Sequence, residues 1–207
     1  MLALSDSDKQ FAFGVNGGSR GAGFDLVYQI NDNFNLRGSY SQYDISESFE
    51  EDDIDYDGEF ELNTTGVMLD YYPFSGAFRL SAGYFNNGTG LAASAQAGAA
   101  GTVDINGVDY DITNEFLDIN MDWDSSTSYI GLGWGNSLGE GSNWTVTFDL
   151  GILLTGEPNA KLTASDGLHA ANPDLIADIA AEEASLNEDL SDFNKYPVLQ
   201  LGLTYAF

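Results

Sequence analysis

The chain has 207 residues, with 33 acidic side chains against 6 basic ones and a formal net charge of −27. Nucleic acid is therefore excluded as a partner, because phosphate binding needs clustered Lys and Arg. Disulfides and thiolate chemistry are excluded because the chain has no cysteine, and no run approaches the roughly 18 apolar residues of a membrane-spanning helix.

Eight segments alternate apolar and polar residues with a period of two, which predicts β-strands with two different faces. Short connections are expected at 31–33, 73–77 and 136–142, with a Gly-rich turn at 17–21. Long connections are expected at about 47–57, 91–115 and 164–194. The eight predicted strands cover 11–16, 24–30, 34–41, 66–72, 78–85, 129–135, 144–152 and 198–207.

The size of the side chains indicates which face points outward. An eight-stranded barrel has an interior just wide enough to be filled by side chains. One face is largely Gly, Ser, Thr and Asn, whereas the other carries Phe, Leu, Tyr, Trp and Ile, which are too bulky to pack inside. Aromatic residues also gather beside the short turns, as in the interfacial girdle of a membrane barrel. These are Tyr28, Phe34, Tyr71, Phe74, Phe78, Trp134, Trp144, Tyr205 and Phe207.

The fold class predicted is therefore all-β: an eight-stranded antiparallel up-and-down transmembrane barrel, formed by residues 1–207 as a single domain. The expected location is the outer membrane of a Gram-negative bacterium, with the three long connections as extracellular loops. A soluble, lipocalin-like carrier is the alternative. The first residues show no basic and apolar leader, so the sequence is expected to be a mature chain with an initiating Met.

Expected partners follow from this placement. They are outer-membrane lipid and lipopolysaccharide, and we expect a monomer. The chain ends in Phe207, with apolar residues at alternate positions before it, and so resembles the terminal signal by which outer-membrane barrels are recognised for assembly. The resemblance implies that the barrel assembly machinery binds through Phe207.

Several segments are similar to a known family. They are LDYYPFSGAFRLSAGYFNNG at 69–88, YIGLGWGNSLG at 129–139, GILLTGEPNAKLTA at 151–164 and YPVLQLGLTYAF at 196–207. With the Gly-rich opening pair of strands, they resemble the carbapenem-associated, ornithine-uptake porins of proteobacteria over most of the chain apart from the loops. The resemblance implies an eight-stranded barrel that passes small solutes, basic ones among them.

The inward register places ionisable residues inside the predicted barrel, with Gln29 and Asn35 nearby. An unpaired charge in a narrow lumen is very costly, so these residues are expected to pair. Such a network either forms a gate whose rearrangement opens a thin path, or fills the lumen permanently and holds the strands in register. The candidates for the lumen ion pairs are Asp25, Arg37, Asp70, Arg79 and Asp149.

The segment 50–58 concentrates carboxylates that would attract cations at the rim. It contains the D-x-D-x-D-G string of a calcium loop, but Thr64 stands where an EF-hand requires Glu and no helix flanks the segment. Weak binding of divalent cations and a solvated hairpin tip are the other interpretations, and no metal site or cofactor is predicted. The candidates for a cation-attracting rim are Glu50, Glu51, Asp52, Asp53, Asp55 and Asp57.

The two later long connections contain local structure signals. The stretch 91–101 is rich in Ala and Gly and is expected to be mobile. Asn106-Gly107 between alternating residues predicts a small hairpin over 103–110. A helix is predicted over 173–192, capped by Asn172, with Leu175, Ile179, Leu186 and Leu190 on one stripe. It is either a lid over the outer mouth or a helix packed on the rim.

No enzyme is predicted, because His169, the only histidine, has no Ser and acid at a recognisable spacing. The first functional hypothesis is a narrow channel or facilitator for small solutes, with cationic ones such as basic amino acids as candidates. The alternative is a closed, non-transporting protein that stabilises the outer membrane or presents loops, since eight strands leave little free lumen.

Overall fold

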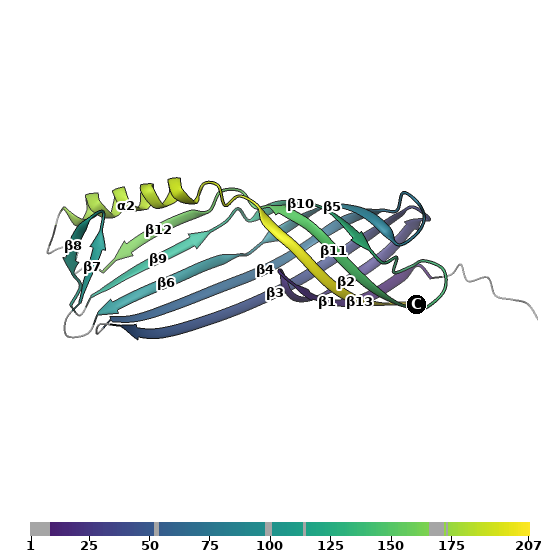
Figure 1. Cartoon of the computed structure of the whole chain (residues 1–207), viewed down its shortest axis with the longest axis horizontal. Coiled ribbons are helices and arrows are strands. Elements are labelled where there is room, and N and C mark those ends of the chain that lie inside the picture. The colour runs from purple at the N-terminus through teal and green to yellow at the C-terminus, as the bar shows by residue number, and fades with distance from the viewer. Residues whose placement is uncertain (1–8, 52–53, 98–100, 114, 166–171, 173) are drawn as a thin grey trace, which may run out of the picture.

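A computed structural model describes residues 9–51, 54–97, 101–113, 115–165, 172 and 174–207. Thirteen strands and one helix make up this part of the chain (Figure 1). In chain order they are β1 (Phe11–Gly18), β2 (Gly21–Asn31), β3 (Phe34–Glu51), β4 (Ile54–Tyr71), β5 (Phe78–Asn87), β6 (Gly90–Ala97), β7 (Thr102–Ile105), β8 (Val108–Asp111), β9 (Phe116–Asp122), β10 (Ser126–Trp134), β11 (Trp144–Leu154), β12 (Asn159–Ala164), α2 (Leu175–Leu190) and β13 (Tyr196–Ala206).

Eight of the strands close into an antiparallel barrel, as predicted. Their order around the barrel is β1-β2-β3-β4-β5-β10-β11-β13, and β13 pairs with β1 to complete the circle. The first and last strands therefore lie side by side, with Ala12 opposite Ala206. Closure leaves no free sheet edge in this part of the molecule.

The outside of the barrel is a continuous apolar surface. The predicted register is confirmed: Phe13, Leu26 and Leu201 point outward and are about half exposed, whereas their chain neighbours face the lumen. In the barrel parts of the eight strands, all of which the structure describes, no outward residue is charged. Aromatic pairs lie on the outer surface at the end of the barrel that carries the short turns. One is Phe34 with Tyr71, whose ring centroids are 4.9 Å apart.

One side of the barrel wall continues far beyond the other. The lower part of β4 pairs with β5, but its upper part pairs with β6, from Ile54 opposite Ala97 to Glu61 opposite Gly90. Strand β9 then pairs with β6, and β12 with β9. We call β6, β9, β12 and the upper halves of β3 and β4 the extension, which occupies the left half of Figure 1.

The inner face of the extension has its own hydrophobic core. Helix α2 and the β7–β8 hairpin pack against it, and the core includes Leu175 and Ile179 of α2 with Ile105 and Ile112 beside them. Of the helical stripe predicted from the sequence, Leu175 and Ile179 are buried here and Leu186 partly so, whereas Leu190 is half-buried and lies outside this core. Among the described residues, no helix is both long enough and apolar enough to span a membrane.

Helix α2 also covers the free edge of the extension. At β12, the side chain of Asn187 accepts a hydrogen bond from the Ala160 N–H at 2.8 Å and donates one to the Ala160 carbonyl at 2.9 Å. Glu183 accepts one from the Leu162 N–H at 3.2 Å. These side chains form hydrogen bonds with backbone groups of β12 that would otherwise be free to pair with another strand.

Three expectations about the connections need correction. Most described residues of the segments 47–57 and 91–115 belong to strands rather than loops, because the alternation continues there in acidic and small residues instead of large apolar ones. The Ala/Gly-rich stretch includes β6, which is paired on both sides. The helix covers Leu175–Leu190 with Asp174 at its N-cap, rather than 173–192 with Asn172 as the cap. The Asn172 side chain instead accepts a hydrogen bond from the Asp174 N–H at 3.2 Å. The predicted hairpin at 103–110 is confirmed by β7 and β8.

The contact between the hairpin and α2 predicts how stability of the extension depends on pH. The Tyr110 hydroxyl donates to Asp178, and this hydrogen bond raises the pKa of Tyr110 to about 12. The same bond, helped by one from Asn106, lowers the pKa of Asp178. Helix docking should therefore weaken as pH falls through the lowered pKa of Asp178, and again as pH rises from about 10 towards that of Tyr110.

Hydrogen exchange of α2 measured against pH tests this. We expect Tyr110→Phe to reduce the rise in α2 hydrogen exchange at both low and high pH. Tyr43→Phe, at an exposed position on β3, should leave the pH dependence of exchange unchanged. An unchanged profile in Tyr110→Phe would contradict the assignment.

Candidate functional site in the barrel lumen

The centre of the lumen holds a cluster of charges built around Arg37 of β3. The Arg37 guanidinium engages two carboxylates, each through two nitrogens. Its Nε and Nη2 lie 3.0 Å from the oxygens of Asp70, and its Nη1 and Nη2 lie 2.9 and 3.1 Å from those of Asp149. Asp25 is a third neighbour, at 3.9 Å from Nη1. Such paired, charge-assisted contacts fix the orientation of the planar guanidinium.

Arg79 of β5 completes the cluster from the other side. Its Nη2 donates to Asp149 at 2.8 Å, and its Nε lies 3.8 Å from Asp70. Its Nη1 donates to the backbone carbonyl of Gly135, and Ser81 donates to Asp70. The structure thus brings together all five lumen candidates, and each is at most 7% exposed.

Glycines opposite these large side chains make room for them. A Cβ at Gly133 would lie 2.8 Å from Cζ of Arg79, and one at Gly151 would lie 2.5 Å from the ring of Tyr129. Gly131 faces the same tyrosine ring. The inner face is therefore glycine-rich where Arg79 and Tyr129 fill the barrel, which links these sequence positions to the packing of the lumen.

Two further levels of the lumen are filled by side chains. On the side of the extension, Phe85, Tyr129 and neighbouring apolar residues form a buried layer, and the Arg20 guanidinium lies 4.9 Å from the centre of the Phe85 ring. At the short-turn end, Leu138 of the turn between β10 and β11 is buried against Ala12 and other lumen residues. No described helix enters the barrel (Figure 1).

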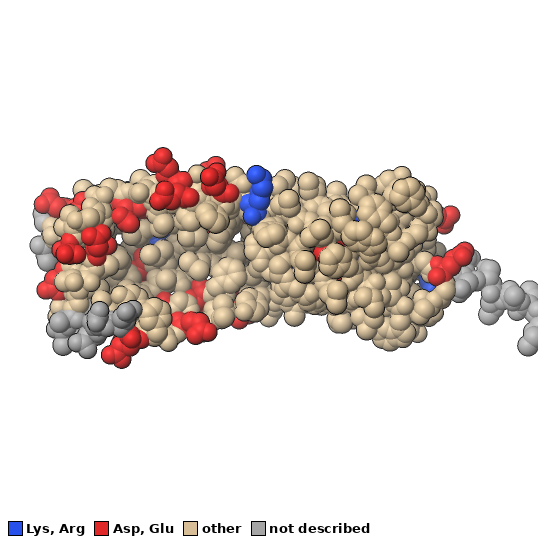
Figure 2. All heavy atoms as spheres, in the orientation of Figure 1, with Lys and Arg blue, Asp and Glu red and all other residues tan. Residues whose placement is uncertain are grey.

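The acidic rim candidates lie at the far tip of the β3–β4 hairpin. Glu50, Asp55 and Asp57 are exposed, with Glu50 directly opposite Asp55. Glu51 belongs to β3, and Asp52 and Asp53 lie outside the described residues. Among the described residues, no group of three His, Cys, Asp or Glu is placed to hold a metal ion. The rim and the lumen cluster lie at different levels of β3, since Arg37 is in its barrel part and Glu50 is near its far end. Figure 2 shows acidic side chains gathered over the extension.

Comparison with solved structures shows which fold this arrangement has. Crystal structures of CarO and CarO2 from Acinetobacter baumannii superpose with TM-scores of 0.60 and 0.61. The fold is that of CarO. Sequence identity to CarO is 20%, with 99% of this chain and 100% of that chain covered, and identity to CarO2 is 19%, with 95% and 98% covered. No protein-family model matches the chain, nor does any curated protein.

The resemblance stated from the sequence is thus confirmed for the CarO-like fold. Sequence reasoning missed Arg20 and Leu138, since both lie in segments predicted as turns, where alternation assigns no face. It also missed Ser81 as a partner of Asp70, although Ser81 belongs to the inward register. His169 lies outside the described residues.

The cluster predicts an order of instability among its variants. Arg37→Met should lower the free energy of unfolding by about 3–5 kcal/mol, because it leaves buried carboxylates without their main cation. Arg79→Met should cost less, since Arg37 still holds Asp149. Adding Asp25→Asn to Arg37→Met should restore part of the loss. Urea unfolding of the refolded barrel measures all three, with the exposed Lys161→Met as control. Equal losses for Arg37→Met and Lys161→Met would show that the cluster is energetically unimportant.

Proposed function

We propose that this protein is an integral outer-membrane barrel. The observation that supports this best is the uncharged, apolar outer surface of the barrel, which is far larger than the apolar patches that soluble monomers expose. Strands β2, β11 and β13, each of 11 residues, match the 9–11 residues with which a strand crosses the hydrocarbon core. Lipid and lipopolysaccharide would contact this surface, and the exposed Phe207 at its edge would be available to the assembly machinery.

We further propose that the barrel is a facilitator for small solutes, with the charge cluster as its gate. The ion pairs of the cluster join side chains only, so a change of rotamers at Arg37 and Arg79 can open the central level without separating strands. The outward face of the extension favours cations, because like charges stand opposite one another at Asp44 and Glu61 and at Glu50 and Asp55. Basic amino acids are the candidate solutes, and no enzymatic role is proposed.

A closed, non-transporting barrel is the second candidate. It is favoured because side chains fill the lumen at three levels. Leu138 fills the short-turn end, the charge cluster fills the centre, and the layer of Phe85 and Tyr129 fills the level next to the extension. Passage would require side chains at all three levels to move. In that case the extension, with its own core, would be the functional part and would present its surface to a partner.

Single-channel recording in planar bilayers separates the two candidates. For the facilitator we expect brief, cation-selective openings that ornithine or lysine reduces, and a higher open probability in Arg79→Met, which removes one anchor of the gate. Lys161→Met, which changes an exposed charge on the extension, should leave the open probability unchanged. If the correctly folded parent protein and the Arg79→Met variant both show no channel openings, the gate is overturned and the closed barrel is supported.

A further inference from the structure

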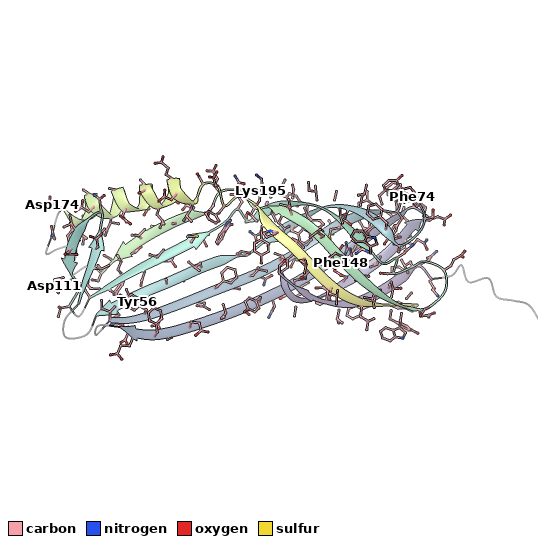
Figure 3. All side chains as sticks on the ribbon, in the orientation of Figure 1. Tyr56, Phe74, Asp111, Phe148, Asp174 and Lys195 are labelled. Carbon is pink, nitrogen blue, oxygen red and sulfur yellow. The ribbon has the colours of Figure 1, made fainter. Side chains whose placement is uncertain are left out.

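A cavity of about 200 Å³ lies where the barrel meets the extension. Its walls are mainly apolar and include Phe60, Leu62, Trp123 and Leu153. The segment between α2 and β13 forms another wall, and the exposed Lys195 and Phe193 there place the cavity at the surface (Figure 3). An engineered apolar cavity of about 150 Å³ holds benzene, so this one has room for a ring with a short chain.

One wall carries a buried cation with unused hydrogen-bond donors. Arg20 is 4% exposed, and only its Nη2 donates to a side chain, Ser39, at 3.2 Å. Within the described residues, its Nε and Nη1 have no hydrogen-bond partner, and no carboxylate lies within ion-pair distance. The buried hydroxyl of Thr64, in the same cavity, also has no partner there. Buried polar groups are normally satisfied, so these donors point to a ligand that accepts hydrogen bonds.

The charges around the cavity indicate an anion. The chain has 33 acidic and 6 basic residues, yet two of the six, Arg20 and Lys195, line this cavity. No Asp or Glu is among the described residues that line it. A cationic ligand would therefore meet two positive charges and no carboxylate in the cavity wall, whereas a carboxylate would be attracted by both and fit the guanidinium.

We propose that this cavity is a binding site for a small amphipathic carboxylate. The carboxylate accepts hydrogen bonds from Arg20 and Thr64, and the apolar body packs among Leu62, Trp123 and Leu153. Lys195 at the mouth attracts the ligand. The site goes beyond passage through the lumen, because binding here requires neither an open gate nor a membrane.

Fluorescence of Trp123 tests the proposal directly. The other two tryptophans, Trp134 and Trp144, are on the outer surface near the short turns, so a Trp134→Phe/Trp144→Phe protein reports on the cavity alone. Titrated with 3-phenylpropionate in detergent, this protein should show saturable quenching. The neutral 3-phenylpropan-1-ol should bind roughly tenfold or more weakly, because a hydrogen bond between charged groups is lost. Acetate, which lacks the apolar body, should also bind at least about tenfold more weakly.

Matched variants locate the charge. Arg20→Met should reduce the affinity for 3-phenylpropionate by roughly ten- to a hundredfold and remove most of its advantage over the alcohol, with Lys195 retaining the remainder. Thr64→Val should cost a few-fold, and Lys161→Met, an exposed charge on the outer face of β12, should have no effect. If Arg20→Met fails to fold, the comparison of acid with alcohol on the parent protein still decides. Equal affinities for acid and alcohol, or no saturable quenching by either, would overturn the proposal whether or not the barrel conducts.

Discussion

An eight-stranded barrel must be filled by its own side chains, and in this protein the filling includes charge. Arg37 satisfies that constraint by binding Asp70 of β4 and Asp149 of β11 each through two nitrogens, while Arg79 of β5 contacts the same two carboxylates. Because the four residues come from β3, β4, β5 and β11, the cluster ties together strands that are not all neighbours. A slip of one strand by a residue would turn an ion onto the apolar outer surface and remove its partner. The cluster thus contributes to the register as well as to closure.

Positive and negative charge are separated along the molecule. Three of the six bases, Arg20, Arg37 and Arg79, are buried within or just above the barrel. The acids gather instead over the extension (Figure 2), with Asp44 opposite Glu61 across β3 and β4. Water and salt screen that repulsion on the exposed sheet, whereas the same charges in the lumen would need partners. Solvent exposure therefore decides where this chain can carry its excess of acid.

Much of the barrel could be predicted from the sequence, because each strand there has one apolar and one polar face. The inward placement of Asp25 and Asp149 follows from alternation alone, and their pairing follows from the cost of a buried charge. The extension could not be predicted in the same way, because Asp55, Asp57 and Glu59 alternate with residues of mixed character on a sheet that water covers. No local pattern shows that β4 pairs with β5 in its lower part and with β6 in its upper part.

The same limit explains the residues of the site that were missed. Arg20 and Leu138 lie in turns, so their burial depends on how distant parts of the chain meet. In the sequence, Gly133 and Gly151 are inward positions without a side chain, and nothing there shows why. In the structure, each makes room for a large side chain from a neighbouring strand. Cross-strand complementarity of this kind becomes visible only once the register is known.

The length of β3 sets the height of the molecule. The strand has 18 residues, of which those up to Gln42 pair with β2 in the barrel. The remainder, from Tyr43 to Glu51, rises about 20–30 Å further, allowing for strand tilt. Since these residues continue barrel strands through pairing with β4 as far as Glu51 and Ile54, this part of the extension is a hydrogen-bonded sheet rather than a set of irregular loops. In the proposed membrane placement, an approaching molecule passes the acidic tip, then the cavity beside Arg20 and finally the lumen, in an order fixed by strand length.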